Sequence, residues 1–89
     1  MAKRVEYKAS VEKDLRKLSA DDALRVLQKI ERTLGTEAEK GEALSGEFAG
    51  LFRLRVGDYR VIYARTEEGY LVLRVGHRRE VYTRGRLVY

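Results

Sequence analysis

The hydrophobic pattern of this chain changes its period at Gly50, and a chain built this way has few folds open to it. Between Ser10 and Gly50, apolar residues recur every three or four positions, which is the spacing of a buried helix face. After Gly50, apolar and polar residues alternate, as in strands with one buried face. Helices followed by strands favour an α+β fold, with the helices on one face of an antiparallel sheet. At 89 residues, the chain is expected to form a single domain over residues 1–89.

The first half of the chain predicts one strand and two helices. Residues 4–9 alternate in the manner of a strand, and Ser10 is placed to cap a short helix behind it. A second helix should begin with a capping box at Ser19 and end at Gly35, or fray on towards Gly41. The apolar stripes of the two helices comprise Val11, Leu15 and Leu18, and Ala23, Leu27, Ile30 and Leu34. Because the connection between them is short, the helices should form an antiparallel hairpin.

The second half predicts an antiparallel meander of three strands. These strands are expected at residues 51–56, 59–64 and 70–76, with tight turns at residues 57–58 and 67–69. Together with the N-terminal strand they should form one four-stranded sheet that carries both helices on one face. The opposite face should then present three basic side chains to solvent, namely Arg53, Arg55 and Arg60.

The whole net charge of the chain lies in this sheet-forming half. Residues 50–89 contain nine arginines, four acidic residues and no lysine, which equals the formal net charge of +5. The remaining residues hold equal numbers of basic and acidic side chains, including all six lysines. Charge alone does not require arginine, but a guanidinium offers a planar fork of donors that binds phosphate oxygens bidentately and stacks on bases. The split therefore points to a phosphate-binding surface.

The three arginines on the predicted meander have two interpretations, one as an ordinary solvated strand face and one as a functional site. A solvated polar face is ordinary for a half-buried strand, and on spacing alone it is slightly favoured for Arg53 and Arg55. Arg60 changes this balance, because like charges on adjacent strands destabilise a sheet by up to ~1 kcal/mol per pair. An anionic partner is therefore the favoured interpretation of the three arginines together.

Residues 75–82 hold the densest set of reactive side chains. Gly76 permits a bend or bulge that would aim His77 and Arg78 away from the strand, and Tyr82 follows. Histidine, arginine and tyrosine can supply proton transfer, charge neutralisation and stacking. A lone histidine in a strand is more often structural, however, and Tyr82 would equally suit a half-buried core position.

Several classes of chemistry are disfavoured. The chain has no cysteine and one histidine, which argues against a zinc site, and it has no phosphate loop, glycosidase carboxylate pair or Ser–His–Asp arrangement. Four acidic residues in the sheet half are few for a metal-dependent nuclease, so a nuclease here is expected to need no metal and no cofactor. No apolar run approaches the ~20 residues of a membrane helix and no signal peptide is evident, so we expect a cytoplasmic protein without a membrane partner.

The chain resembles the RelE toxins of the RelE/ParE superfamily, which are ribosome-dependent mRNA endonucleases of type II toxin–antitoxin pairs. The resemblance covers nearly the whole length and implies the fold predicted above. It is carried by the strand–helix–helix opening and by Leu44-Ser-Gly46, Leu51-Phe-Arg-Leu-Arg55, Gly57-Asp-Tyr-Arg-Val-Ile-Tyr63 and Val75-Gly-His-Arg-Arg-Glu-Val-Tyr82. The last two segments together are the most specific part of the match.

The resemblance also implies a reaction. In such enzymes the RNA 2′-hydroxyl attacks the adjacent phosphodiester and leaves a 2′,3′-cyclic phosphate, without a metal. By motif position, Arg60 is implied to stabilise the transition state, and Arg78 to protonate the leaving group or contact the phosphate. Tyr82 is implied to stack on or orient a base.

The identity of the general base stays open. Some relatives carry lysines at the positions of Arg53 and Arg55, and arginine effectively never loses its proton. These two residues therefore suit charge stabilisation of the pentacovalent phosphate. His77 is a candidate for proton transfer because histidine commonly serves as a base, although it is not the standard catalytic position of the family.

The implied partners are mRNA in the ribosomal A site and a RelB-like antitoxin. The arginines expected to bind RNA are Arg53, Arg55, Arg74, Arg79 and Arg84. Two alternatives stay open: a ParE-like toxin that poisons DNA gyrase without cleaving anything, and a basic module that binds RNA without cleaving it. ParE-like relatives generally lack the basic and aromatic set, so the nuclease is favoured.

Overall fold

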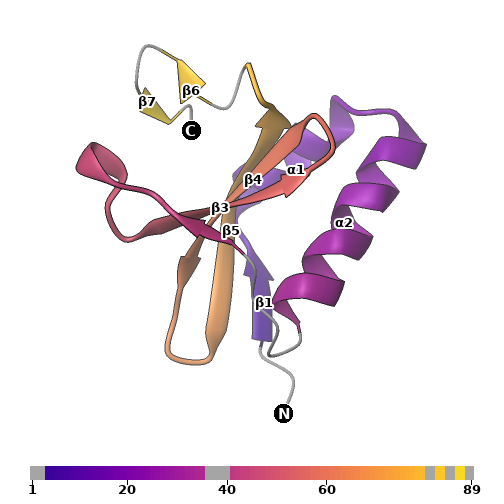
Figure 1. Ribbon diagram of the computed structural model, residues 1–89. Helices are drawn as coiled ribbons and strands as arrows, with labels where there is room; N and C mark the ends of the chain where they lie inside the picture. Colours follow the sequence, from indigo (N-terminus) through magenta and orange to yellow (C-terminus); the bar gives the residue numbers. More distant parts are fainter. Residues whose placement is uncertain (1–3, 36–40, 80–81, 84–85, 88–89) are drawn as a thin grey trace.

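The computed structural model describes residues 4–35, 41–79, 82–83 and 86–87, with side chains described up to Arg79 (Figure 1). The elements in chain order are β1 (Arg4–Tyr7), α1 (Ala9–Arg16), α2 (Ala20–Leu34), β2 (Glu42–Ala43), the 3-10 turn η1 (Gly46–Phe48), β3 (Leu51–Val56), β4 (Tyr59–Arg65), β5 (Gly69–His77), β6 (Tyr82–Thr83) and β7 (Arg86–Leu87). The predicted α+β class is confirmed. Among the described residues, no helix is long and apolar enough to cross a membrane.

The main sheet has five strands where the sequence predicted four. Its order is β1-β5-β4-β3-β2; β1 runs parallel to β5 and the other neighbours are antiparallel. The added strand is β2, in which Glu42 pairs with Arg53 and Ala43 with Phe52. Two residues of low strand propensity give no pattern of their own, so only the pairing with β3 reveals this strand. A separate two-stranded sheet joins β6 and β7.

The two helices begin differently from one another. The predicted cap of α2 is present, because the Ser19 hydroxyl accepts a hydrogen bond from the Asp22 N–H at 3.1 Å, and the helix ends with Gly35 as its C-cap. The predicted cap of α1 is wrong: that helix begins at Ala9, inside the stretch predicted as strand, after Lys8 as N-cap. Ser10 therefore lies within the helix. The possible continuation of α2 towards Gly41 lies partly outside the described residues.

α1 covers an edge that β1 leaves open. β1 pairs with β5 only as far as Val72, so the rest of β5 would present unpaired backbone groups. The Ser10 hydroxyl donates to the carbonyl of Leu73 at 2.7 Å, and the Asp14 carboxylate accepts from the Val75 N–H at 2.9 Å. Two side chains one helical turn apart thus replace a neighbouring strand.

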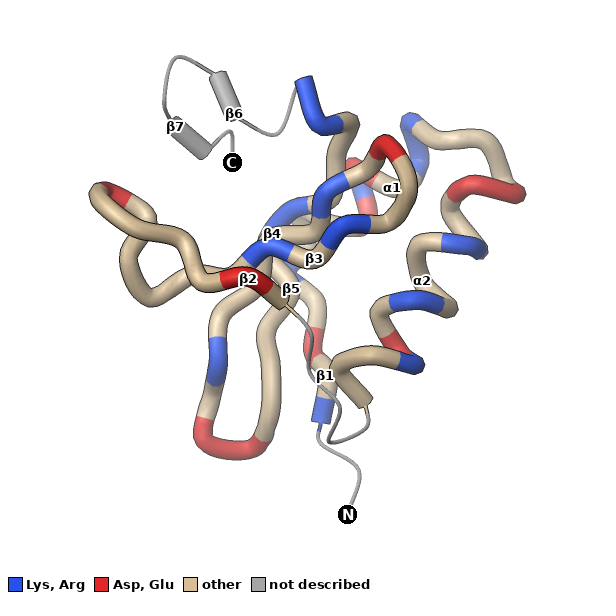
Figure 2. The backbone as a smooth tube through the Cα atoms, viewed as in Figure 1, with Lys and Arg blue, Asp and Glu red and all other residues tan. Residues whose placement is uncertain are grey.

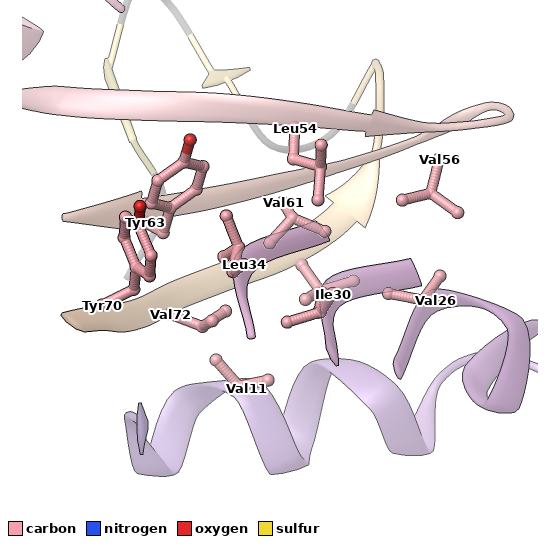
Figure 3. Close-up of a cluster of buried hydrophobic side chains, with 11 residues drawn as sticks. Val11, Val26, Ile30, Leu34, Leu54, Val56, Val61, Tyr63, Tyr70 and Val72 are labelled. Atoms are coloured by element: carbon pink, nitrogen blue, oxygen red, sulfur yellow. The ribbon is translucent and has the colours of Figure 1, made fainter. Parts of the chain in front are cut away.

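The main core lies between the helices and one face of the sheet (Figure 3). Val11, Val26, Ile30 and Leu34 of the helices meet inward-facing residues of the strands. The sheet contributes Leu54, Val56, Val61, Tyr63, Tyr70, Val72 and Val75. Burial of these side chains stabilises the fold by about 25 cal/mol for each Å² of apolar surface removed from water. It also fixes which alternate residues of β3 and β4 must face away from the helices.

The face away from the helices carries apolar residues as well as the three predicted arginines. Ile62 and Leu73 are buried there, and the chain segment around η1 covers them with Leu44 and Phe48. Leu51, Ala64 and Leu71 pack on the same small cluster. The face is therefore divided into an apolar part, formed with residues of β3, β4 and β5, and an arginine part on β3 and β4.

A β-bulge in β5 resets the alternation of its side chains. Ile62 pairs with Arg74 and Tyr63 with Val72, so Leu73 is the extra residue. Val72 and Val75 consequently both face the main core although they are three residues apart. The sequence had suggested Gly76 as the position of a bulge, but Gly76 pairs regularly with Arg60.

Candidate functional site

Three arginines lie together on the face away from the helices. Arg55 and Arg60 are direct cross-strand partners in the β3–β4 register, and Arg53 lies two residues from Arg55 on β3. Leu54, Val56 and Val61 alternate with them and are buried in the main core, which leaves the arginine side chains on the other face. Figure 2 shows these basic positions side by side on neighbouring strands. We call this set, Arg53, Arg55 and Arg60, the arginine face.

One carboxylate lies beside two of these arginines. Glu42 Oε1 is 3.0 Å from Arg55 Nε, and Glu42 Oε2 is 3.5 Å from Arg53 Nη2. The Glu42 side chain is 52% exposed and that of Arg55 56%, whereas Arg53 is 26% exposed. The buried Nε of Arg53 has no hydrogen-bond partner among the described residues, so this guanidinium keeps an unused donor. Glu42 belongs to the unpredicted strand β2, which explains why the sequence did not bring it to the site.

Arg60 is held without a carboxylate. Its Nη1 donates to the carbonyls of Gly57 at 2.9 Å and Tyr59 at 3.0 Å, which fixes the guanidinium against the β3–β4 turn. Carbonyl oxygens orient the group but carry no formal charge. Within the described part of the chain, the positive charge of Arg60 is thus positioned and uncompensated by an ion pair.

The turn after β5 adds two exposed arginines at the same end of the sheet. Arg78 and Arg79 follow His77 directly and are both exposed. The Arg78 N–H donates to the carbonyl of Asp58 at 2.8 Å, which ties this turn to the β3–β4 turn that holds Arg60. The backbone therefore places Arg78 close to the arginine face.

His77 lies on the helix side of the sheet. It is the cross-strand partner of Tyr59, and the two rings make an edge-to-face contact with centroids 6.1 Å apart. Tyr59 packs on the main core and its hydroxyl donates to Asp22 Oδ2 at 2.9 Å, a hydrogen bond that raises the tyrosine pKa. His77 Nδ1 accepts from the Arg79 N–H at 3.3 Å. Because Tyr59 and Arg60 are successive residues of one strand, His77 and Arg60 face opposite sides.

Arg74 is engaged in a buried ion pair. Its Nε donates to Asp14 Oδ2 at 2.8 Å and its Nη2 to Asp14 Oδ1 at 2.6 Å, with side-chain exposures of 13% and 4%. The same carboxylate also accepts from the backbone of β5. The geometry thus gives Arg74 a structural partner instead of an open position for RNA.

The remaining expected site residues, Tyr82 and Arg84, have no described side chains. Tyr82 is in β6, of which the backbone alone is described, and Arg84 lies outside the described residues. In the described part of the chain, no group of three or more His, Cys, Asp or Glu residues is arranged to hold a metal ion.

Comparison with known proteins gives consistent matches. The profile of the family described as "ParE toxin of type II toxin-antitoxin system, parDE" matches residues 5–82. The toxin–antitoxin complex RelBE2 from Mycobacterium tuberculosis matches with 26% identity and a TM-score of 0.73, over 86% of this chain and 92% of that one. Comparison with curated protein sequences gives no match.

Two further solved structures show the same fold at lower identity. The isolated RelE toxin of E. coli is 20% identical, with a TM-score of 0.68 over 85% of this chain and 84% of that one. YafQ of E. coli is 17% identical, with a TM-score of 0.66 over 91% of this chain and 99% of that one.

Proposed function

Because the chain belongs to the ParE toxin family of type II toxin–antitoxin systems, within the RelE/ParE superfamily, we propose that it is a toxin that cleaves mRNA on the ribosome. Cleavage would proceed without a metal, by attack of the 2′-hydroxyl on the adjacent phosphodiester, and would leave a 2′,3′-cyclic phosphate. The result is inhibition of translation.

The observation that carries this proposal is the arginine face itself. Arg55 and Arg60 are cross-strand partners, and only one carboxylate, Glu42, is paired with the three arginines among the described residues. Such a cluster of like charge is costly without an anion. A phosphodiester gains negative charge as it becomes pentacovalent, and fixed cations aimed at that charge are the strongest means of lowering the barrier.

Each arginine has a proposed task. Arg60 stabilises the transition state, because carbonyls hold it in place and leave its charge available. Arg53 and Arg55 bind the scissile phosphate, and Arg78 and Arg79 contact phosphates on the turn beside them. Tyr82 stacks on a base and Arg84 adds a further phosphate contact, as the resemblance implies. Arg74 is left out of this set because Asp14 holds it.

The proposed partners are mRNA in the ribosomal A site and a RelB-like antitoxin. The solved structures of RelBE2 from M. tuberculosis and of RelBE from E. coli are both toxin–antitoxin complexes. An acidic or amphipathic antitoxin would complement the net charge of +5 of this chain.

A second candidate function is poisoning of DNA gyrase. The observation in its favour is the family profile, which carries the ParE description. The two functions are separated by incubating the protein with programmed ribosomes and mapping new mRNA 5′ ends, alongside a gyrase cleavage and supercoiling assay. New 5′ ends that require the ribosome support the nuclease. No new ends, together with gyrase inhibition, would overturn it, and RNA binding without either effect would favour a non-cleaving module.

A further inference from the structure

The proposed cleavage needs a group that accepts the proton of the attacking 2′-hydroxyl. Arginine effectively cannot serve, because its guanidinium stays protonated. His77 is turned to the helix side, where its ring meets Tyr59 and its Nδ1 meets the backbone of Arg79. Among the described residues, neither the arginine face nor His77 therefore supplies this base.

Glu42 is a carboxylate that lies beside the arginine face. It stands on the edge strand β2, directly beside Arg53 in the ladder, and its two oxygens are divided between Arg53 and Arg55. Half of its side chain is open to solvent, so it is accessible to a substrate lying on the same face. Within the described part of the chain, it is the one carboxylate that forms ion pairs with the arginine face.

We infer that Glu42 is the general base of the proposed RNA cleavage, an inference that rests on the proposed function. The 2′-hydroxyl proton passes to the Glu42 carboxylate as the 2′-oxygen forms its bond to phosphorus. The bond from phosphorus to the 5′-oxygen breaks, and the leaving oxygen takes a proton from solvent. The products are a 2′,3′-cyclic phosphate and a 5′-hydroxyl end, and Glu42 then returns its proton to water.

The contacts of Glu42 suit this task because the arginines can exchange partners. When a phosphodiester binds, its oxygens can replace those of the Glu42 carboxylate as acceptors for the guanidinium donors of Arg53 and Arg55. Arg53 also keeps a buried Nε donor without a partner among the described residues. In a nucleotide the 2′-hydroxyl is adjacent to the scissile phosphate, so a phosphate on these two arginines brings that hydroxyl next to Glu42.

The competing explanation is that Glu42 merely offsets the charge of its neighbours. An exposed ion pair of this kind contributes little to stability. If charge balance were its only role, removing the carboxylate would strengthen the binding of RNA and leave the cleavage step equally fast or faster. The two explanations are therefore separated by the rate of the chemical step, which falls only if Glu42 is the base.

The test is the single-turnover cleavage rate on programmed ribosomes with saturating toxin, for Glu42→Gln and wild type across a range of pH. We expect a loss of about 10²–10⁴-fold in the rate, the usual contribution of a general base, with RNA binding equal to or tighter than wild type. The rise in rate with pH on the acid side should also disappear in the variant. Glu47→Gln is the matched control, because Glu47 is an exposed glutamate of the nearby turn η1.

A substrate with a sulfur leaving group sharpens the assignment. Sulfur at the 5′-position departs without protonation, so a missing acid is rescued by this substrate and a missing base is not. Glu42→Gln should therefore stay slow on it. A wild-type rate for Glu42→Gln, or rescue by the sulfur substrate, would overturn the role of Glu42 while leaving the nuclease intact. Absence of cleavage by the wild-type protein would instead overturn the nuclease itself.

Discussion

Two arginine–carboxylate contacts on this small sheet differ in almost every physical respect. Asp14 and Arg74 form a bidentate pair with side-chain exposures of 4% and 13%, and the carboxylate also holds the backbone of β5. Glu42 shares its oxygens between Arg53 and Arg55 with about half of its side chain in solvent. Both contacts place a guanidinium by means of a carboxylate. The first leaves it no freedom to bind anything else, whereas the second leaves a carboxylate and two cations ready to exchange partners.

The difference in burial separates a structural arginine, Arg74, from the proposed functional arginines, Arg53 and Arg55. Removing one partner of a buried ion pair leaves an uncompensated charge in a medium of low dielectric constant. Breaking such a pair therefore strongly destabilises the fold, which makes the role of the pair structural. An exposed pair is screened by water and salt, and its formation is worth little. Arginine content alone therefore does not define the proposed RNA-binding surface. The deciding property is whether the partner of each guanidinium is buried.

The largest expected effect comes from breaking the buried contact. Asp14→Ala should lower the free energy of unfolding by about 3–5 kcal/mol, because Arg74 keeps its charge and the Val75 N–H loses its acceptor. Urea unfolding followed by circular dichroism measures this loss. Glu12→Ala is the control, since Glu12 forms an exposed pair with Arg16 on the same helix and should cost less than about 1 kcal/mol. Equal losses in the two variants would contradict the assignment of Asp14.

The next effect concerns activity. Arg60→Ala should slow ribosome-dependent cleavage by about 10²–10³-fold, the usual cost of removing one donor aimed at transition-state charge. Its unfolding curve should stay close to that of wild type, because in the described part of the chain Arg60 bonds only to the nearby carbonyls of Gly57 and Tyr59. Arg16→Ala removes an exposed arginine of α1, outside the arginine face, and should cleave normally. Retained toxicity of Arg60→Ala in cells would count against the mechanism.

A smaller effect is expected on binding. Arg55→Ala should remove one phosphate contact, which lowers the salt dependence of single-stranded RNA binding by about 0.7 in the slope of log affinity against log salt. Titrations at several salt concentrations measure that slope, with Arg16→Ala again as control. An unchanged slope would place the phosphates elsewhere on the molecule.

The sequence was sufficient to predict the class of fold and the positions of the long elements. Strong periodicity identifies α2 and β3–β5, because burial of one face imposes the spacing of their apolar residues. The α1 start was misplaced because Ser10 binds a distant carbonyl in preference to its own helix end. The two-residue strand β2 has no periodicity to detect, since its existence depends on pairing with β3.

The sequence was sufficient to predict which arginines share a face of the sheet, but not which carboxylates pair with them. Alternation on β3 and β4 brought Arg53, Arg55 and Arg60 to one face. The fate of Arg74 depended on Asp14, 60 positions earlier in the chain, and no local rule connects them. One signal was present: Asp14 lies within the apolar stripe of α1, between Val11 and Leu15, where a carboxylate requires a buried partner.

The smallest expected effect is the stability change on removing the exposed contact, and it is the sharpest test of the comparison. Glu42→Ala should change the free energy of unfolding by less than about 1 kcal/mol, because water already solvates half of this carboxylate and screens its pairs. A double-mutant cycle with Arg55→Ala isolates the coupling, which should lie at about 0.2–1 kcal/mol and shrink as salt is added. A coupling as large as the loss from Asp14→Ala would mean that Glu42 is locked in place. A locked carboxylate could not exchange partners with a phosphate, and its proposed role as a base would fail with it.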